Sequence, residues 1–135
     1  MLRIAFDTLP DSKVRDRLGD LLETNEDTSI EEVARLFGCS GYVVESVPLA
    51  LYGAQQIRRL DFAVMLQELI RVGGDTDTNS SIAGQVAGTL IGRARLPQTL
   101  ETHLPELKFI ESTVMQFVRA MEGSGNLKNK QSEIS

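Results

Sequence analysis

The chain of 135 residues has no tryptophan, one cysteine, one histidine and few aromatic side chains, which make up 5% of its residues. A lone cysteine cannot close an internal disulfide. Zinc sites need several cysteine or histidine ligands, and neither Cys39 nor His103 has another such residue nearby in the sequence. We therefore expect no disulfide-stabilised domain and no zinc domain. Cys39 is interpreted as a packing residue and His103 as a loop residue.

Long hydrophobic runs and clusters of basic residues are also missing. No apolar run approaches the roughly 18 residues that cross a bilayer, and the N-terminus lacks the pattern of a secretory signal. The chain carries 14 basic and 19 acidic residues, a net charge of −5, with no lysine or arginine run that could follow a phosphate backbone. We expect a cytoplasmic protein with neither a membrane nor a nucleic acid as its partner.

Helical spacing of apolar residues runs through almost the whole chain, and no segment alternates convincingly as a strand would. The sequence therefore predicts an all-α helical bundle of about six helices. The length suits one core rather than two, so residues 1–122 are expected to form one domain. Residues 123–135 are polar and glycine-containing, which predicts a disordered tail.

The first two predicted helices have clear start signals. The first should begin at Asp11 or Ser12. Ser29 and Glu32 have the spacing of a capping box, in which each residue satisfies a free backbone N–H at the start of a helix. Gly38 should end this second helix.

The later helices are read mainly from periodicity. Residues 42–57 form the third, with a kink or boundary expected at Pro48, because proline lacks a hydrogen-bond donor. Asp61 can cap the fourth, residues 78–92 form the fifth, and a sixth carries the cleanest apolar stripe of the sequence. That stripe consists of Leu107, Ile110, Val114, Phe117, Val118 and Met121.

Glycine recurs at every fourth position of the fifth predicted helix, at Gly84, Gly88 and Gly92. Each glycine costs roughly 1 kcal/mol relative to alanine inside a helix. We expect close approach of another helix backbone along this ridge to offset that cost, with Ala83 and Ala87 widening the smooth strip.

The most informative segment is the acidic loop, residues 73–78, which reads Gly-Gly-Asp-Thr-Asp-Thr. Asp75, Asp77 and Thr78 place two carboxylates and a hydroxyl where a loop enters a helix, and such hard oxygen ligands suit a divalent cation such as magnesium. One aspartate could instead simply cap the helix. Capping needs only one carboxylate, however, and two neighbouring carboxylates repel unless a cation or donors intervene.

Other motifs that share parts of this pattern fail on spacing. An EF-hand would need glycine where Ser80 stands and glutamate where Val86 stands. A P-loop would need a lysine that this region lacks. Aspartate-nucleophile phosphatases place their Asp-x-Asp after a buried strand, whereas the segment before this loop has helical periodicity.

The acidic loop resembles the hallmark of the ADP-ribosylglycohydrolase family, a Gly-Gly-Asp-Thr-Asp-Thr loop followed by a helix of small residues, here residues 82–88. Upstream, residues 41–52 are similar to the family's Glu-Ser-x-Pro-x-Ala segment, and Leu96-Pro97 is similar to its proline after the glycine helix. The three segments occur in the family's order. The resemblance spans roughly residues 29–107.

This resemblance implies an all-α fold that corresponds to the C-terminal half of the family's domain. It also implies hydrolysis of an ADP-ribose linkage on a modified protein or related acceptor, with magnesium or manganese as cofactor. Asp75, Asp77 and Thr78 would be metal ligands, and the segment Ser40-Gly41-Tyr42 would approach the ADP-ribose. Tyr42 is open to a simpler interpretation as a half-buried aromatic at a helix start.

The chain departs from the family in one respect. Full-length members have an N-terminal half that supplies a glutamate and a Thr-Asp-Asp run to the metal site, and this half is missing here. Residues 26–28 echo that run only superficially and read as the start of a helix. We therefore assign no catalytic residue within this chain, and expect weak metal binding and weak or no activity without an N-terminal half or partner. An N-terminal-half partner chain or a second copy is expected to bury the apolar faces that the missing half would cover. The alternative is a non-enzymatic structural or interaction protein that retains the fold.

Overall fold

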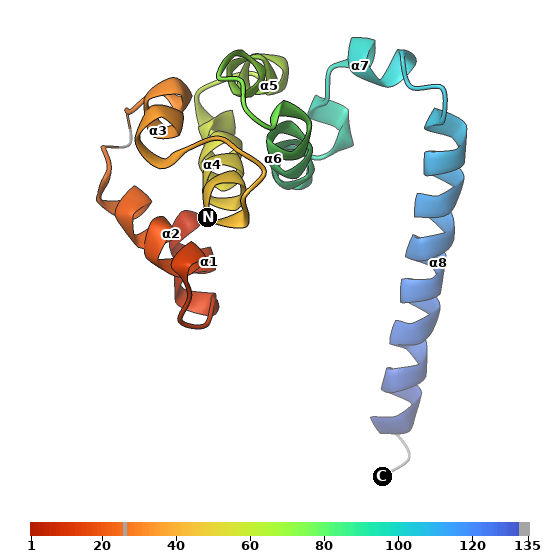
Figure 1. Cartoon of the computed structure of the whole chain (residues 1–135). Coiled ribbons are helices and arrows are strands. Elements are labelled where there is room, and N and C mark those ends of the chain that lie inside the picture. Colours follow the sequence, from red (N-terminus) through yellow and green to blue (C-terminus); the bar gives the residue numbers. More distant parts are fainter. Residues whose placement is uncertain (26, 133–135) are drawn as a thin grey trace. The chain divides into compact units, whose positions relative to one another are not determined.

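The computed structural model describes residues 1–25 and 27–132, and it describes side chains up to residue 122. Within these residues the chain is helical and contains no strand, so the all-α prediction is confirmed (Figure 1). The helices are α1 (Leu2–Thr8), α2 (Lys13–Glu23), α3 (Ile30–Phe37), α4 (Val43–Gln55), α5 (Phe62–Arg71), α6 (Thr76–Ile91), α7 (Gln98–Thr102) and α8 (Leu107–Ser132), with 3₁₀ turns η1 (Gln56–Arg58) and η2 (Arg93–Arg95).

The chain divides into two compact units, Met1–Leu96 and Pro97–Ser135. In the first unit, α4 is the central helix and contacts α1, α2, α3, α5 and α6. The largest side chains that are completely or almost completely buried there come from four different helices, which makes one shared core. They are Leu18, Val33, Leu49, Tyr52, Met65 and Leu69. Tyr52 is buried with its hydroxyl satisfied, since it donates to the backbone carbonyl of Thr28 at 2.6 Å.

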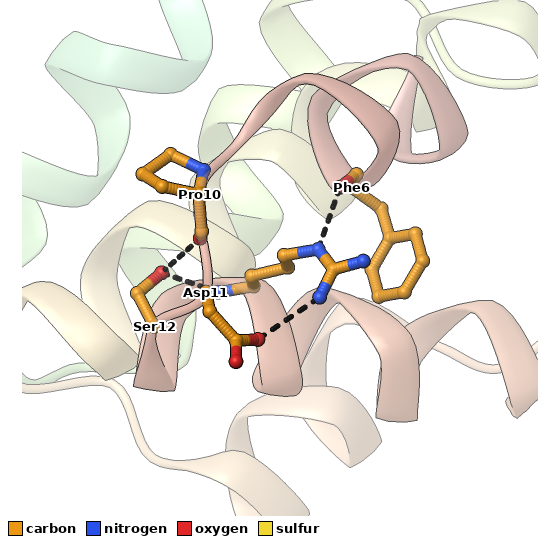
Figure 2. Close-up of polar contacts among 5 residues, drawn as sticks. Phe6, Pro10, Asp11 and Ser12 are labelled. Carbon is orange, nitrogen blue, oxygen red and sulfur yellow. Dashed lines mark hydrogen bonds and ion pairs between the residues drawn. The ribbon is translucent and has the colours of Figure 1, made fainter.

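Polar contacts hold the corner between α1 and α2 (Figure 2). The Arg15 side chain donates to the carbonyl of Phe6 at 3.2 Å and to the carboxylate of Asp11 at 3.1 Å. Its guanidinium also lies 4.5 Å from the centre of the Phe6 ring. The Ser12 hydroxyl donates to the Pro10 carbonyl and accepts from the backbone N–H of Arg15, so it caps α2.

The two predicted helix starts were correct. Ser12 is the N-cap of α2, and Ser29 is the N-cap of α3, where its hydroxyl accepts from the N–H of Glu32 at 3.1 Å. Gly38 ends α3 with a φ of 92°, a conformation that glycine adopts easily. The predicted count of six helices was too low, because α1 and α7 have only 7 and 5 residues and too few apolar positions to show a period.

Other boundaries differ from the prediction. Helix α4 continues through Pro48, so Pro48 marks no boundary. Asp61 occupies the N-cap position of α5 but makes no capping hydrogen bond with its side chain. Helix α6 begins at Thr76 rather than residue 78, because Asp75 serves as its N-cap.

The predicted glycine ridge of α6 was wrong. A Cβ atom at Gly84 would meet only ordinary contacts, the nearest being Leu66 at 3.7 Å, and at Gly88 it would meet no described atom within 4 Å. Gly92 has a φ of 72° and ends the helix. The packed face of α6 is instead formed by Ala83 and Ala87, which are both completely buried. These alanines were expected only to widen a glycine surface, but they are the residues that pack.

The second unit contains α7 and α8. The apolar stripe predicted for the sixth helix lies on α8, where Phe109, Val114, Phe117 and Met121 are each more than half exposed. Helix α8 is assigned as far as Ser132, which takes it into the segment expected to be a disordered tail, and residues 133–135 lie outside the described residues. Across the described part of the chain, no helix is both long and apolar enough to span a bilayer.

Candidate functional site

Two segments far apart in the sequence meet in the first unit: the α3–α4 loop, residues 38–42, and the acidic loop, residues 73–78. Their junction is the backbone carbonyl of Cys39, which accepts two hydrogen bonds. One comes from the N–H of Asp75 at 3.0 Å and the other from the side-chain amide of Asn79 at 2.8 Å. A single carbonyl therefore ties the α3–α4 loop to the start of α6.

Two glycines allow this close approach. Gly74 has a φ of 70°, and a Cβ atom there would lie 2.8 Å from the carbonyl carbon of Cys39 and 2.7 Å from its sulfur. A Cβ atom at Gly41 would overlap Oδ2 of Asp75. Since contacts this short do not occur between real side chains, both positions require the absence of a side chain in this arrangement.

Asp75 is the N-cap of α6, and its Oδ1 accepts from the backbone N–H of Thr78 at 3.3 Å. The simpler interpretation of one aspartate as a cap is therefore correct for Asp75. It does not account for Asp77, which is exposed in the first turn of the same helix. Nor does it account for the second carboxylate oxygen of Asp75, which faces Gly41.

The pKa of Asp75 reflects the presence of Asp77 and Thr78 beside it. The pKa of Asp75 is lowered, first by a hydrogen bond with the Asp77 carboxyl group and then by the side chain and backbone N–H of Thr78, while partial burial opposes the shift. Two neighbouring carboxylates repel unless hydrogen-bond donors or a cation lie between them.

The donor set fits a hard divalent cation only in part. Asp75, Asp77 and Thr78 offer carboxylate and hydroxyl oxygens from one helix start, the ligand type that magnesium prefers. Within the described residues, however, no cluster of three or more histidine, cysteine, aspartate or glutamate side chains could hold a metal ion. Any cation bound here would need water or further residues to complete its shell.

The three predicted substrate residues lie in the α3–α4 loop beside this pair. Gly41 is the one in direct proximity to Asp75. The Ser40 hydroxyl accepts from the backbone N–H of Tyr42 at 3.3 Å. Tyr42 is the N-cap of α4, and 54% of its surface is exposed, which fits the simpler interpretation of a half-buried aromatic at a helix start.

Asn79 is the residue that sequence reasoning missed. Its side chain is completely buried, and its Oδ1 finds no hydrogen-bond partner within the described structure. The sequence shows an amide beside two aspartates in an early helical turn, but it does not show that this amide is buried, because burial depends on the distant segment that contains Cys39. Cys39 is half-buried at the junction of the two loops, as a packing residue would be. His103 is the C-cap of α7, and its Nδ1 lies 2.6 Å from the carbonyl oxygen of Thr99.

A cavity that borders Cys39 does not include the aspartates in its lining. It measures about 270 Å³ and is lined by Ala34, Cys39 and Val72 together with charged side chains of α3 and α5. Asp75 itself is partly buried, and Asp77 is exposed.

Comparison with known proteins identifies the family of the chain. Residues 1–127 match the ADP-ribosylglycohydrolase family, and the chain belongs to that family. It is 31% identical over 105 residues to a bovine protein named ADP-ribosylhydrolase ARH3. The match covers 71% of this chain but only 28% of the bovine protein, so the chain spans less than a third of that relative's length. No solved structure matches the chain.

Proposed function

We propose that this chain provides one part of a metal-dependent ADP-ribosylglycohydrolase site, which hydrolyses the ADP-ribose linkage on a modified protein or related acceptor. Asp75, Asp77 and Thr78 would hold magnesium or manganese. Ser40, Gly41 and Tyr42 would contact the ADP-ribose. The observation that supports this most is the approach of Gly41 to Oδ2 of Asp75, because it joins the proposed substrate loop to the proposed metal ligands.

Each residue has a distinct part in this proposal. Oδ1 of Asp75 is engaged with Thr78, so Oδ2 is the oxygen left to face the substrate loop. Asp77 is exposed and interacts with Asp75, so its carboxylate would serve the same cation. A bound divalent ion would orient a water or the ribose hydroxyls and lower the pKa of what it binds. Tyr42, which follows Gly41, would offer an aromatic face to the ligand.

We propose that the isolated chain is an incomplete enzyme. Two carboxylates and one hydroxyl leave most of magnesium's octahedral shell to water. The exposed apolar stripe of α8 is the kind of surface that a protein partner covers. An N-terminal-half partner chain would provide further metal ligands and would also bury this stripe. A second copy of the chain would only bury the stripe. We place the protein in the cytoplasm, in keeping with its single cysteine.

The exposed stripe also favours a second candidate function, that of a structural or interaction protein that retains the fold without catalysis. The two functions make different predictions for Asp75→Asn and Asp77→Asn. In an enzyme, each substitution should abolish magnesium- or manganese-dependent release of ADP-ribose from an ADP-ribosylated protein while leaving the helical circular-dichroism signal intact. If the wild-type chain releases none, with or without added metal, the lone chain is not an enzyme.

A further inference from the structure

Glu45, at the third position of α4, makes more contacts with the α3–α4 loop than helix capping requires. One oxygen of its carboxylate, Oε2, accepts from the backbone N–H of Ser40 at 3.0 Å and from the Ser40 hydroxyl at 2.7 Å. In an ordinary capping box the glutamate bonds to the N-cap residue itself, here Tyr42. Glu45 instead reaches two residues further back, into the loop.

The carboxylate also fits closely against Gly38, which has a φ of 92°. A Cβ atom there would overlap Cδ and Oε2 of Glu45 and would lie 2.7 Å from Cγ. No side chain fits there while Glu45 holds its place. The same carboxylate oxygen, Oε2, therefore contacts both Gly38 and Ser40 of the loop.

Arg17 makes a smaller contribution to the ionisation of Glu45 than Ser40 does. The Arg17 guanidinium forms an ion pair with Asp20 at 3.7 Å and lies 4.9 Å from the centre of the Phe37 ring. Hydrogen bonds from the side chain and backbone of Ser40 lower the pKa of Glu45, and Arg17 lowers it further, while partial burial opposes the shift. The carboxylate is therefore in the charged form that accepts both hydrogen bonds most strongly.

The loop held by Glu45 is the one that meets the acidic loop. Cys39 precedes Ser40 and accepts from Asp75 and Asn79, and Gly41 follows Ser40 and faces Oδ2 of Asp75. We infer that Glu45 is a positioning residue: by holding Ser40 through two hydrogen bonds, it sets the place of Gly41 and thereby the orientation of the Asp75 carboxylate. This inference rests on the proposed function, because it assigns Glu45 a role in that site.

The test compares Glu45→Ala with Glu45→Gln. Both hydrogen bonds from Ser40 end on one oxygen, so glutamine can present its carbonyl oxygen in the same place, whereas alanine offers no acceptor. Glu23→Ala, an exposed glutamate of α2, is the matched control. ADP-ribose binding is measured by calorimetry in the presence of magnesium, and thermal unfolding is measured for all variants.

We expect Glu45→Ala to weaken ADP-ribose binding roughly 10- to 100-fold, the usual effect of losing a residue that orients a ligand-binding group. Glu45→Gln and Glu23→Ala should bind close to wild type. Equal weakening in Glu45→Gln and Glu45→Ala would overturn the inference, because hydrogen-bond geometry would then not be the cause. Unchanged binding in Glu45→Ala would overturn it as well.

A second measurement separates this inference from the proposed function. In the ligand-free protein, the backbone amide signals of Gly41 and Asp75 should shift in Glu45→Ala and stay near their wild-type positions in Glu45→Gln. If Glu45→Ala leaves both signals in place, Glu45 does not set the loop. If the wild type binds no ADP-ribose, the proposed function fails, and the amide comparison still decides whether Glu45 controls the position of Asp75.

Discussion

The side-chain amide of Asn79 donates to the backbone carbonyl of Cys39 at 2.8 Å, although the two residues are 40 positions apart in the sequence. Asn79 is completely buried at the start of α6, and the same carbonyl also accepts from the N–H of Asp75. The hydrogen bond therefore joins the two segments that carry the proposed site, and it stabilises their junction from inside the fold.

Asn79→Ala should destabilise the protein by about 1–3 kcal/mol, because a buried hydrogen bond to the backbone is lost. Gln85→Ala is the matched control, since it removes an exposed amide from the same helix. Urea unfolding of both variants measures the difference. Equal stability of the two variants would show that the bond to Cys39 contributes nothing.

Gly73 and Gly74 form a matched pair for testing the close packing of the two loops. Both have a positive φ, 79° and 70°, but no described atom lies within 4 Å of a Cβ at Gly73, whereas Cys39 blocks a Cβ at Gly74. Gly73→Ala should cost about 1 kcal/mol from backbone strain alone. Gly74→Ala should cost about 1–3 kcal/mol more than Gly73→Ala, because the added Cβ overpacks the contact with Cys39. Similar unfolding free energies for the two variants would contradict the described junction of the loops.

Gly41→Ala should separate binding from stability. The added Cβ overlaps a terminal oxygen of Asp75, and turning that side chain away removes its cap on α6, which costs about 1 kcal/mol. We expect an unfolding free energy lowered by about that amount, together with manganese binding weakened by roughly 10- to 100-fold. Gly88→Ala, where a Cβ meets no described atom within 4 Å, is the control and should bind manganese as wild type does. Loss of binding in both variants would contradict a specific role for Gly41.

The contribution of the Glu45 negative charge to stability should be lost in acid. Because the two Ser40 hydrogen bonds and Arg17 lower the pKa of Glu45, the carboxylate stays ionised, and its contribution to stability stays in place, at and above the ordinary range for glutamate. That contribution disappears as the pH falls through the lowered pKa. Carbon NMR of the Glu45 carboxyl group should give a midpoint below that of an unfolded peptide of the same sequence, and Ser40→Ala should raise it. A midpoint at or above the peptide value would be incompatible with the described contacts.

Local signals predicted much of the fold. Ser12 and Ser29 cap their helices as their spacing indicated, and Gly38 ends α3. These features depend on residues within one helical turn of each other, so the sequence alone contains the information. The position of Asp75 at the start of α6 was likewise readable, although the sequence could not decide whether that residue only caps the helix.

Long-range pairings could not be predicted in the same way. The glycines of α6 looked like a packing ridge, yet Ala83 and Ala87 are the buried residues, because the choice of face depends on where α4 and α5 lie. The contact of Asn79 with Cys39 and that of Glu45 with Ser40 depend on loop shapes that no periodicity encodes. The sequence therefore indicated the residues of the proposed site, but not the contacts that hold its two loops together.

The central claim is that a divalent cation binds where the acidic loop meets the α3–α4 loop. Titration of the isotope-labelled chain with manganese tests it most directly, because this paramagnetic ion broadens the amide signals of nearby residues even when it binds weakly. We predict selective broadening of residues 40–42 and 73–78 in the wild type, and its loss in Asp75→Asn and Asp77→Asn. Broadening that is absent from these residues, or that persists unchanged in both variants, would contradict the account.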